Sequence, residues 1–155
     1  MWVPCNQYYD SSKIDIDCTA CTCDAGKFKF DLVLNTDRFP AETSWTLKDD
    51  SNKIILSNSG YSEILTIFEE SACLVNGCYD FVILDIFGDG ICCFEGDGYY
   101  KGTLHGNTLA FSGGEFGRQA SHEFCGEDPC SVSNRGASID NKFPLHTTDD
   151  ENGGN

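Results

Sequence analysis

The sequence predicts an all-β protein, a jelly-roll-like antiparallel β-sandwich braced by disulfides. Short segments rich in β-branched and aromatic residues recur about every ten residues, a spacing typical of sandwiches and jelly rolls. Turn residues separate these segments, and 16 glycines among 155 residues supply the turns that many short strands need. Ten cysteines indicate the disulfides. No segment shows the apolar periodicity of an amphipathic helix.

We expect eight strands, most of them supported by alternation of apolar and polar residues. The first carries Phe28, Phe30 and Leu32 on one face and lysines on the other. The expected strands span residues 27–35, 43–48, 53–57, 62–68, 79–84, 99–105, 108–112 and 118–124, with residues 69–77 as a connection. Their apolar faces predict a core of Phe28, Phe30, Leu32, Trp45, Leu65, Ile67, Phe81, Ile83, Leu104 and Leu109.

The strands define one module, residues 27–125, with an extension at each end. Residues 1–26 form a cysteine-rich N-terminal extension without strand periodicity, and residues 126–155 form a polar C-terminal extension. The first five residues have neither the basic start nor the apolar core of a signal peptide. We therefore expect a mature or excised piece of a secreted protein.

The charge balance limits the partners. With 25 acidic and 10 basic residues the formal net charge is −15, which disfavours binding to nucleic acid and to anionic membrane surfaces. No apolar run is long enough to span a bilayer, so membrane insertion is not expected. An acidic chain suits cation binding, although most of its carboxylates are expected to be ordinary solvated surface groups.

The cysteines favour disulfides formed in an oxidising, extracellular compartment. An alternative is a zinc site made by Cys18, Cys21 and Cys23 with Cys125 and Cys130, but the spacing of the second pair is poor. We expect five bridges among Cys5, Cys18, Cys21, Cys23, Cys73, Cys78, Cys92, Cys93, Cys125 and Cys130. Within the module, Cys73, Cys78, Cys92 and Cys93 are expected to pair among themselves. The adjacent Cys92 and Cys93 are each expected to take a partner elsewhere, in a connectivity that sequence leaves open.

An acidic glycine-rich loop is the most informative motif. Asp85 and Asp89 stand four residues apart around Gly88 and Gly90, where a tight backbone can turn both carboxylates toward one point. Calcium prefers six to eight such oxygens. The loop is not an EF-hand, because Phe87 and Gly96 occupy two of the ligand positions that it would need.

Further calcium ligands must therefore come from elsewhere in the chain. Asp37 and Glu42 lie on the first long loop, and loops distant in sequence meet at one end of a sandwich. We expect Asp37, Glu42, Asp85 and Asp89 to converge on one calcium ion, with backbone carbonyls completing its shell. The alternative is that Asp85 and Asp89 only stabilise a turn.

Four sequence blocks resemble a family of modules. They read Asp85-x-Phe-Gly-Asp-Gly-Ile-Cys-Cys93, Thr36-Asp-x-Phe-Pro-x-Glu-Thr-Ser-Trp-x-Leu47, Cys73-Leu-x-x-x-Cys-Tyr79 and Gly113-Gly-x-Phe-Gly117. Together they resemble a cysteine-rich β-module of secreted diatom, algal and marine bacterial proteins, often found beside peptidases. The resemblance covers about residues 27–124 and implies an extracellular accessory module without activity of its own.

No enzymatic activity is expected. His105, His122 and His146 stand in unrelated contexts, and the chain has no Gly-x-Ser-x-Gly nucleophile motif. Carboxylate pairs of the kind that hydrolyse glycosides stay open, because 25 acidic residues offer many pairs.

Binding of carbohydrate is the specific activity that we expect. Phe87, Phe94, Tyr99 and Tyr100 flank the acidic loop and are candidates for a platform on which sugars stack. The alternative for each ring is an ordinary place in the core.

The sequence thus predicts a non-catalytic, secreted, calcium-associated module for adhesion or for binding glycans or protein surfaces. One alternative is a structural subunit of an extracellular coat, filament or other assembly, formed with copies of itself or with a larger parent protein. The other is an accessory fragment of a secreted hydrolase or peptidase.

Overall fold

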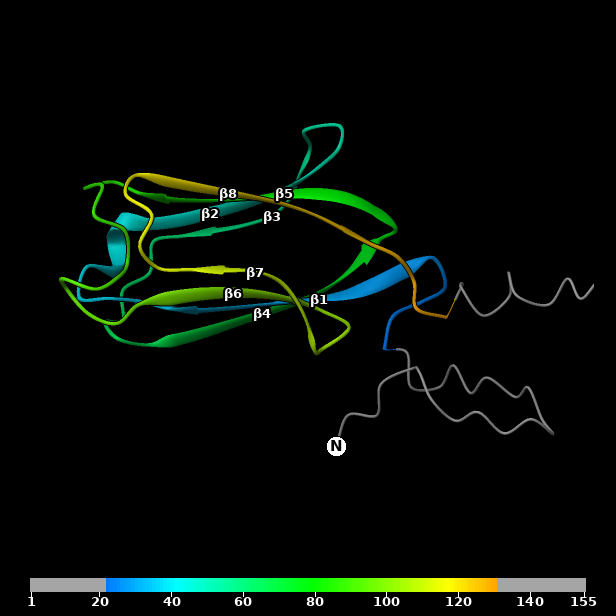
Figure 1. Ribbon diagram of the computed structural model, residues 1–155, viewed down its shortest axis with the longest axis horizontal. Helices are drawn as coiled ribbons and strands as arrows, with labels where there is room; N and C mark the ends of the chain where they lie inside the picture. Colours follow the sequence, from blue (N-terminus) through cyan, green and yellow to red (C-terminus); the bar gives the residue numbers. More distant parts are fainter. Residues whose placement is uncertain (1–21, 131–155) are drawn as a thin grey trace, which may run out of the picture.

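The computed structural model describes residues 22–130. Its strands are β1 (Lys27–Asn35), β2 (Thr43–Asp49), β3 (Ile54–Ser59), β4 (Ile67–Val75), β5 (Gly77–Asp85), β6 (Tyr99–Leu104), β7 (Thr108–Gly113) and β8 (Gln119–Gly126). Two four-stranded antiparallel sheets, ordered β4-β1-β6-β7 and β3-β2-β5-β8, pack face to face (Figure 1). The predicted antiparallel β-sandwich is confirmed. The one helical segment among the described residues is a short 3-10 turn, η2 (Pro40–Glu42).

Seven of the eight expected strands are confirmed to within two residues at each end. The prediction of a strand over 62–68 and a connection over 69–77 is wrong, because β4 runs from Ile67 to Val75. Among the described strands this one lies at the edge of its sheet and pairs with β1 alone. Most of its side chains are exposed, so it lacks the alternation that identifies a half-buried strand. What makes residues 67–75 a strand is their continuous hydrogen-bonded pairing with β1.

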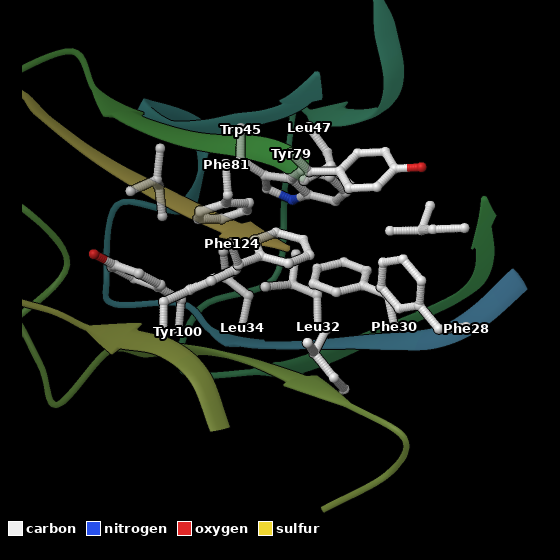
Figure 2. Close-up of a cluster of buried hydrophobic side chains, with 14 of the residues drawn as sticks. Phe28, Phe30, Leu32, Leu34, Trp45, Leu47, Tyr79, Phe81, Tyr100 and Phe124 are labelled. Carbon is white, nitrogen blue, oxygen red and sulfur yellow. The ribbon is translucent and has the colours of Figure 1, made fainter. Parts of the chain in front are cut away.

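The core lies between the sheets and is mostly aromatic (Figure 2). Strict alternation in β1 buries Phe28, Phe30, Leu32 and Leu34, and Phe81 of β5 stacks on the Phe111 ring at 4.5 Å between centroids. Of the predicted core residues, the structure buries Phe28, Phe30, Leu32, Trp45, Phe81, Ile83 and Leu104. Burial of Phe81 and Ile83 confirms the register of the central strand.

Three predicted core residues, Leu65, Ile67 and Leu109, are instead more than half exposed. Leu65 belongs to a loop, where its backbone has a φ of 50°, and Ile67 begins the edge strand β4. In β7 the register with β6 shifts between Leu109 and Phe111, so the two side chains face opposite ways. Local bulges of this kind cannot be read from alternation alone.

Antiparallel order distributes the connections over two ends of the sandwich (Figure 1). One end, which we term the loop end, carries the long connections 36–42, 60–66, 86–98 and 114–118. The other, the hairpin end, carries the short connections 50–53, 76 and 105–107, together with residues 22–26 and 127–130. Every long connection of the described chain therefore lies at the loop end.

Two disulfides join segments that are distant in sequence, and both lie at the hairpin end. Cys23, just before β1, is bonded to Cys73 of β4, and Cys78 of β5 is bonded to Cys125 of β8. Cys92 and Cys93 lie at the loop end and are bonded to each other. We expected Cys73, Cys78, Cys92 and Cys93 to pair among themselves, with Cys92 and Cys93 each bonded to a residue other than its neighbour. This expectation is wrong. Strand β5 separates Cys73 and Cys78, at the hairpin end, from Cys92 and Cys93, at the loop end.

Cys130 is also disulfide-bonded. Cys23, Cys125 and Cys130 therefore have no thiolate to offer a metal, which removes the zinc alternative for these three residues. Cys5, Cys18 and Cys21 lie outside the described residues, as do most of the predicted N-terminal extension 1–26 and C-terminal extension 126–155. No helix within residues 22–130 is long and apolar enough to cross a membrane.

Candidate metal centre

Three carboxylates from two loops meet at the loop end of the sandwich. Ligand oxygens of Glu42, Asp85 and Asp89 all lie within 4.8 Å of one another. Strand pairing causes this meeting, because β2 and β5 are neighbours and Thr43, the first residue of β2, lies opposite Asp85, the last residue of β5. Glu42 directly precedes Thr43, and its carbonyl accepts a hydrogen bond from the Ile86 amide at 3.2 Å.

The loop after β5 turns back on itself as its glycines predict. Gly88 and Gly90 have φ values of +90° and +75°, in the left-handed region that side chains disfavour. The Gly88 amide donates a hydrogen bond to Oδ1 of Asp85 at 2.7 Å. Asp85 therefore does stabilise a turn, which was the alternative role predicted for it. The hydrogen bond from Gly88 engages one oxygen of the Asp85 carboxylate, and the turn brings Asp89 back toward Asp85.

Asp37 is coupled electrically to this cluster. Its carboxyl group is buried, with 4% of the residue exposed, and Oδ1 accepts a hydrogen bond from the Phe39 amide at 2.8 Å. Burial raises the pKa of Asp37 above its ordinary value, against the lowering effect of the Phe39 amide, and the charges of Asp85 and Asp89 raise it further. Of the four predicted ligands the structure thus brings Glu42, Asp85 and Asp89 within 4.8 Å of one another, whereas Asp37 is not part of that group and interacts with it through charge.

The ionisation of Glu42 is also disfavoured by burial and by neighbouring negative charges. Its pKa is raised first by loss of solvent and then by the charges of Asp85, Asp89 and Asp37, with Glu95 adding a smaller effect. Each of these neighbours disfavours the ionised form. A bound cation would reverse that balance.

No basic side chain offsets the cluster. Within residues 22–130 the ion pairs are Lys27–Asp24 and Lys29–Asp31, and neither includes a carboxylate of the cluster. Arg118 lies close by, packed against Gly88, but its guanidinium donates to the Ile86 carbonyl at 3.3 Å. The carboxylates of the cluster thus form no ion pair within residues 22–130, and Arg118 is the basic side chain that lies nearby.

Thr43 is a functional candidate that the sequence analysis missed. Only 1% of it is exposed, and its hydroxyl oxygen has no hydrogen-bond partner among the described residues. In β2 it alternates inward with Trp45 and Leu47, so its side chain lies on the same face as Asp85, its cross-strand neighbour. A buried hydroxyl without a partner costs about 1–3 kcal/mol. The position of Thr43 two residues before the inward Trp45 was the available signal.

An open depression adjoins the cluster. It has a volume of about 600 Å³ and is lined by Gly88, Asp89, Cys92, Cys93, Phe94, Glu115, Phe116 and Gly117. Asp89 belongs both to the carboxylate cluster and to the depression wall. The two features therefore form one continuous surface.

The structure exposes three of the four rings of the predicted aromatic platform. Phe87 and Phe94 are 73% and 88% exposed, and Tyr99 is partly exposed. The prediction for Tyr100 is wrong, because alternation in β6 turns its ring into the core, where its hydroxyl bonds to Nε2 of His122 at 2.7 Å. Of these rings only Phe94 lines the depression.

The histidines lie apart from the cluster. His122 faces Tyr100 from β8, and His105 lies in the turn between β6 and β7, at the hairpin end, with its ring tilted against Phe28. No histidine joins a possible metal-ligating group within residues 22–130. His146 lies outside that range.

Fold and site together define a disulfide-braced β-sandwich with an acidic cluster at one end. Searches of family models, of curated proteins and of solved structures find no match to this chain. The resemblance to the marine β-module stays a prediction.

Proposed function

We propose that this chain is a non-catalytic, calcium-binding module of a secreted protein, which binds glycans or other extracellular surfaces. The observation that carries the proposal is the meeting of Glu42, Asp85 and Asp89 beside the unpartnered hydroxyl of Thr43. One cation would account both for carboxylates that form no ion pair and for a buried hydroxyl without a hydrogen-bond partner. Asp37 is a fourth carboxylate whose charge interacts with Asp85 and Asp89, although it lies outside the group of three.

The donor set favours calcium over other cations. Zinc prefers histidine and cysteine ligands, whereas the cluster offers only oxygen. Magnesium demands near-ideal octahedral geometry and usually retains several waters. Calcium accepts six to eight oxygens in flexible geometry, which suits carboxylates contributed by two separate loops.

Secretion is supported by the disulfides and by the acidic composition. Disulfides Cys23–Cys73 and Cys78–Cys125 persist in oxidising compartments and are rare in the cytosol. The sequence resemblance points the same way, toward an accessory module of an extracellular protein. An exposed depression beside the cation site supplies a surface for a ligand.

Calcium titration tests the cation site. We expect calcium to raise the melting temperature relative to chelator, because an ion that binds only the folded state stabilises it by about 2.7 kcal/mol at a hundredfold excess over Kd. Asp89→Asn should abolish the rise. The matched control is Asp50→Asn, which removes the same charge from an exposed turn at the hairpin end and should retain it.

Calorimetry with calcium and with magnesium completes the test. Calcium should bind with one site per chain, and magnesium should bind more weakly. Equal melting curves in millimolar calcium and in chelator would sink the proposal and would leave Asp85 and Asp89 as turn residues. An equal loss in both variants would show an unspecific charge effect and would also contradict it.

A structural subunit is the second candidate, favoured by one observation. Edge strand β3 carries Ile54 and Ile55, which are 53% and 37% exposed, and no strand within residues 22–130 covers its outer edge. Light scattering after size exclusion decides between the two. A calcium-independent polymer that Ile54→Lys dissociates would favour the assembly role.

A further inference from the structure

We infer that the depression beside the cation centre binds a neutral saccharide, through two adjacent hydroxyls on the bound calcium and a ring face against Phe94 and the Cys92–Cys93 disulfide. The inference rests on the proposed calcium site and names the ligand class of that site. Three features of the described surface carry it: the side on which the cluster opens, the apolar wall next to it, and the charge around both.

The cluster opens toward the depression. Asp37 and Asp85 are each 4% exposed, whereas Asp89 is exposed and forms part of the depression wall. A cation held among these carboxylates is therefore closed off on the side of the core and accessible on the side of Asp89. Calcium takes more oxygens than a few carboxylates supply and fills the remaining positions with water or ligand oxygen. Adjacent hydroxyls of a sugar can replace two such waters.

The wall next to Asp89 is apolar and exposed. Phe94 is 88% exposed, the most exposed of the large apolar side chains in the described chain. Beside it, Cys92 and Cys93 are bonded to each other, so their disulfide joins no two strands, unlike the bridges at the hairpin end. It presents a compact pair of polarisable sulfur atoms. The apolar face of a sugar ring packs against such surfaces and against aromatic rings.

The wall is held in position before any ligand binds. The amides of Ile91 and Cys92 both donate to the Gly114 carbonyl, at 3.0 and 3.1 Å, which ties the cysteine pair to the connection between β7 and β8. Phe116 of that connection packs edge-on against the buried Tyr100 ring, 5.8 Å away. A site formed in advance loses less conformational entropy on binding.

Charge selects a neutral ligand over an acidic one. Glu115 lines the depression and Glu95 lies close enough to disfavour ionisation of Glu42. One calcium ion also leaves the carboxylates Asp37, Glu42, Asp85 and Asp89 in excess. Uronates and sulfated sugars would meet this negative field, whereas a neutral sugar can donate a hydroxyl hydrogen bond to Glu115.

Affinity electrophoresis of the full chain tests the inference. The gels contain one neutral polysaccharide each (mannan, galactan, laminarin or dextran) or the acidic alginate, run in calcium and in chelator. We expect at least one neutral polysaccharide to retard the protein in calcium only, with no retardation by alginate. Phe94→Ala should weaken the neutral binding about tenfold while the calcium-dependent rise in melting temperature is kept. Phe87→Ala, which removes another highly exposed ring that does not line the depression, should bind as the unchanged chain does.

The outcomes separate the two proposals. No retardation by any of the neutral gels, with the calcium-dependent melting rise intact, overturns the saccharide inference and leaves the cation site standing. Binding to alginate alone, or retardation that is unchanged in chelator, overturns it as well, as does full binding by Phe94→Ala. Absence of the melting rise removes the cation site on which the inference rests.

Discussion

The two ends of the sandwich are built in different ways. The hairpin end has short turns and two long-range disulfides, Cys23–Cys73, which ties the segment before β1 to β4, and Cys78–Cys125, which cross-links β5 and β8. The loop end has four longer connections and no cross-link between strands among the described residues, since Cys92 is bonded to its neighbour Cys93. Covalent bracing is thus concentrated away from the acidic cluster. The loop end is left to hydrogen bonds and, by our proposal, to a cation.

The hydrogen bonds of the loop end are mainly made by backbone groups. Leu65 donates to the Asp37 carbonyl at 3.0 Å, and Arg38 donates to the Glu95 carbonyl at 3.1 Å. The buried Thr36 hydroxyl donates to the Glu63 carbonyl at 2.7 Å and accepts from the Thr66 amide at 3.1 Å. These bonds join the first long loop to its two neighbours and so fix where Asp37 lies.

Carboxylates also differ between the two ends. At the hairpin end Asp49 accepts hydrogen bonds from Ser51 and Lys53, and these interactions, the Ser51 hydroxyl first, lower its pKa. At the loop end the pKa values of Asp37 and Glu42 are raised. The turn at the hairpin end stabilises the charge of Asp49, whereas burial and neighbouring carboxylates at the loop end disfavour the charged forms of Asp37 and Glu42.

Of the changes that test the difference between the two ends, removal of a long-range disulfide should have the largest effect on stability. The double variant Cys78→Ala/Cys125→Ala should lower the free energy of unfolding by about 2–5 kcal/mol, because the unfolded chain loses a long-range constraint. Urea unfolding measures it. The corresponding variant Cys92→Ala/Cys93→Ala should cost far less, since its bond spans adjacent residues. Equal losses in both variants would contradict the difference drawn between the ends.

An isosteric change at Thr43 should have an intermediate effect whose sign depends on calcium. In chelator, Thr43→Val should stabilise the protein by about 1 kcal/mol, because it removes a buried hydroxyl without a partner. In calcium the gain should shrink or reverse, because the cation or its water loses an oxygen. Melting curves in both conditions measure the change.

Thr36→Val is the matched control for this prediction. Thr36 is equally buried, but its hydroxyl makes two strong hydrogen bonds within the protein. Its replacement should therefore destabilise the protein by about 1–3 kcal/mol with or without calcium. The same response from both threonines would mean that Thr43 is an ordinary core residue.

The meeting of Glu42, Asp85 and Asp89 could be predicted from the sequence, because it depends only on strand direction and on which connections carry the carboxylates. Strands that alternate in direction place every second connection at the same end, and 36–42 and 86–98 are both such connections. The cysteine pairing failed on a distance that was available in the sequence. From Cys78 to the last residue of β5, Asp85, the strand rises about 23 Å at 3.3 Å per residue, which puts Cys78 and the loop of Cys92 at opposite ends and too far apart for a disulfide.

Other features depend on packing that no local pattern records. Strand β4 carries Glu69, Glu70 and Ser71 in succession, and only pairing with β1 makes it a strand. The bulge between Leu109 and Phe111 reverses the alternation within β7. Gly102 makes room for the Phe111 ring, because any side chain there would collide with it. Each of these is settled by the neighbouring strand and not by the segment itself.

A change in pH should have the smallest effect on stability, and the carboxylates at the two ends should contribute to it with opposite sign. The folded-state pKa values of Asp37 and Glu42 lie above their unfolded values, so the folded protein binds more protons between the two. Without calcium, their contribution to stability therefore falls as the pH rises through that window, which begins at the ordinary carboxyl value of about 4. Asp49, whose folded pKa is lowered, contributes stability above that value and loses it as the pH falls.

Calcium competes with the protons at the loop end and should reverse the trend there. Because the ion binds the ionised carboxylates, the difference in melting temperature between calcium and chelator should be large at neutral pH and should vanish as the pH falls through the raised pKa values. Melting curves in both conditions across this range measure it. Asp49→Asn should lower both curves at neutral pH without changing their difference, since its turn lies at the hairpin end. A calcium effect that persisted unchanged into acid would place the ion on groups other than these carboxylates and would contradict the site.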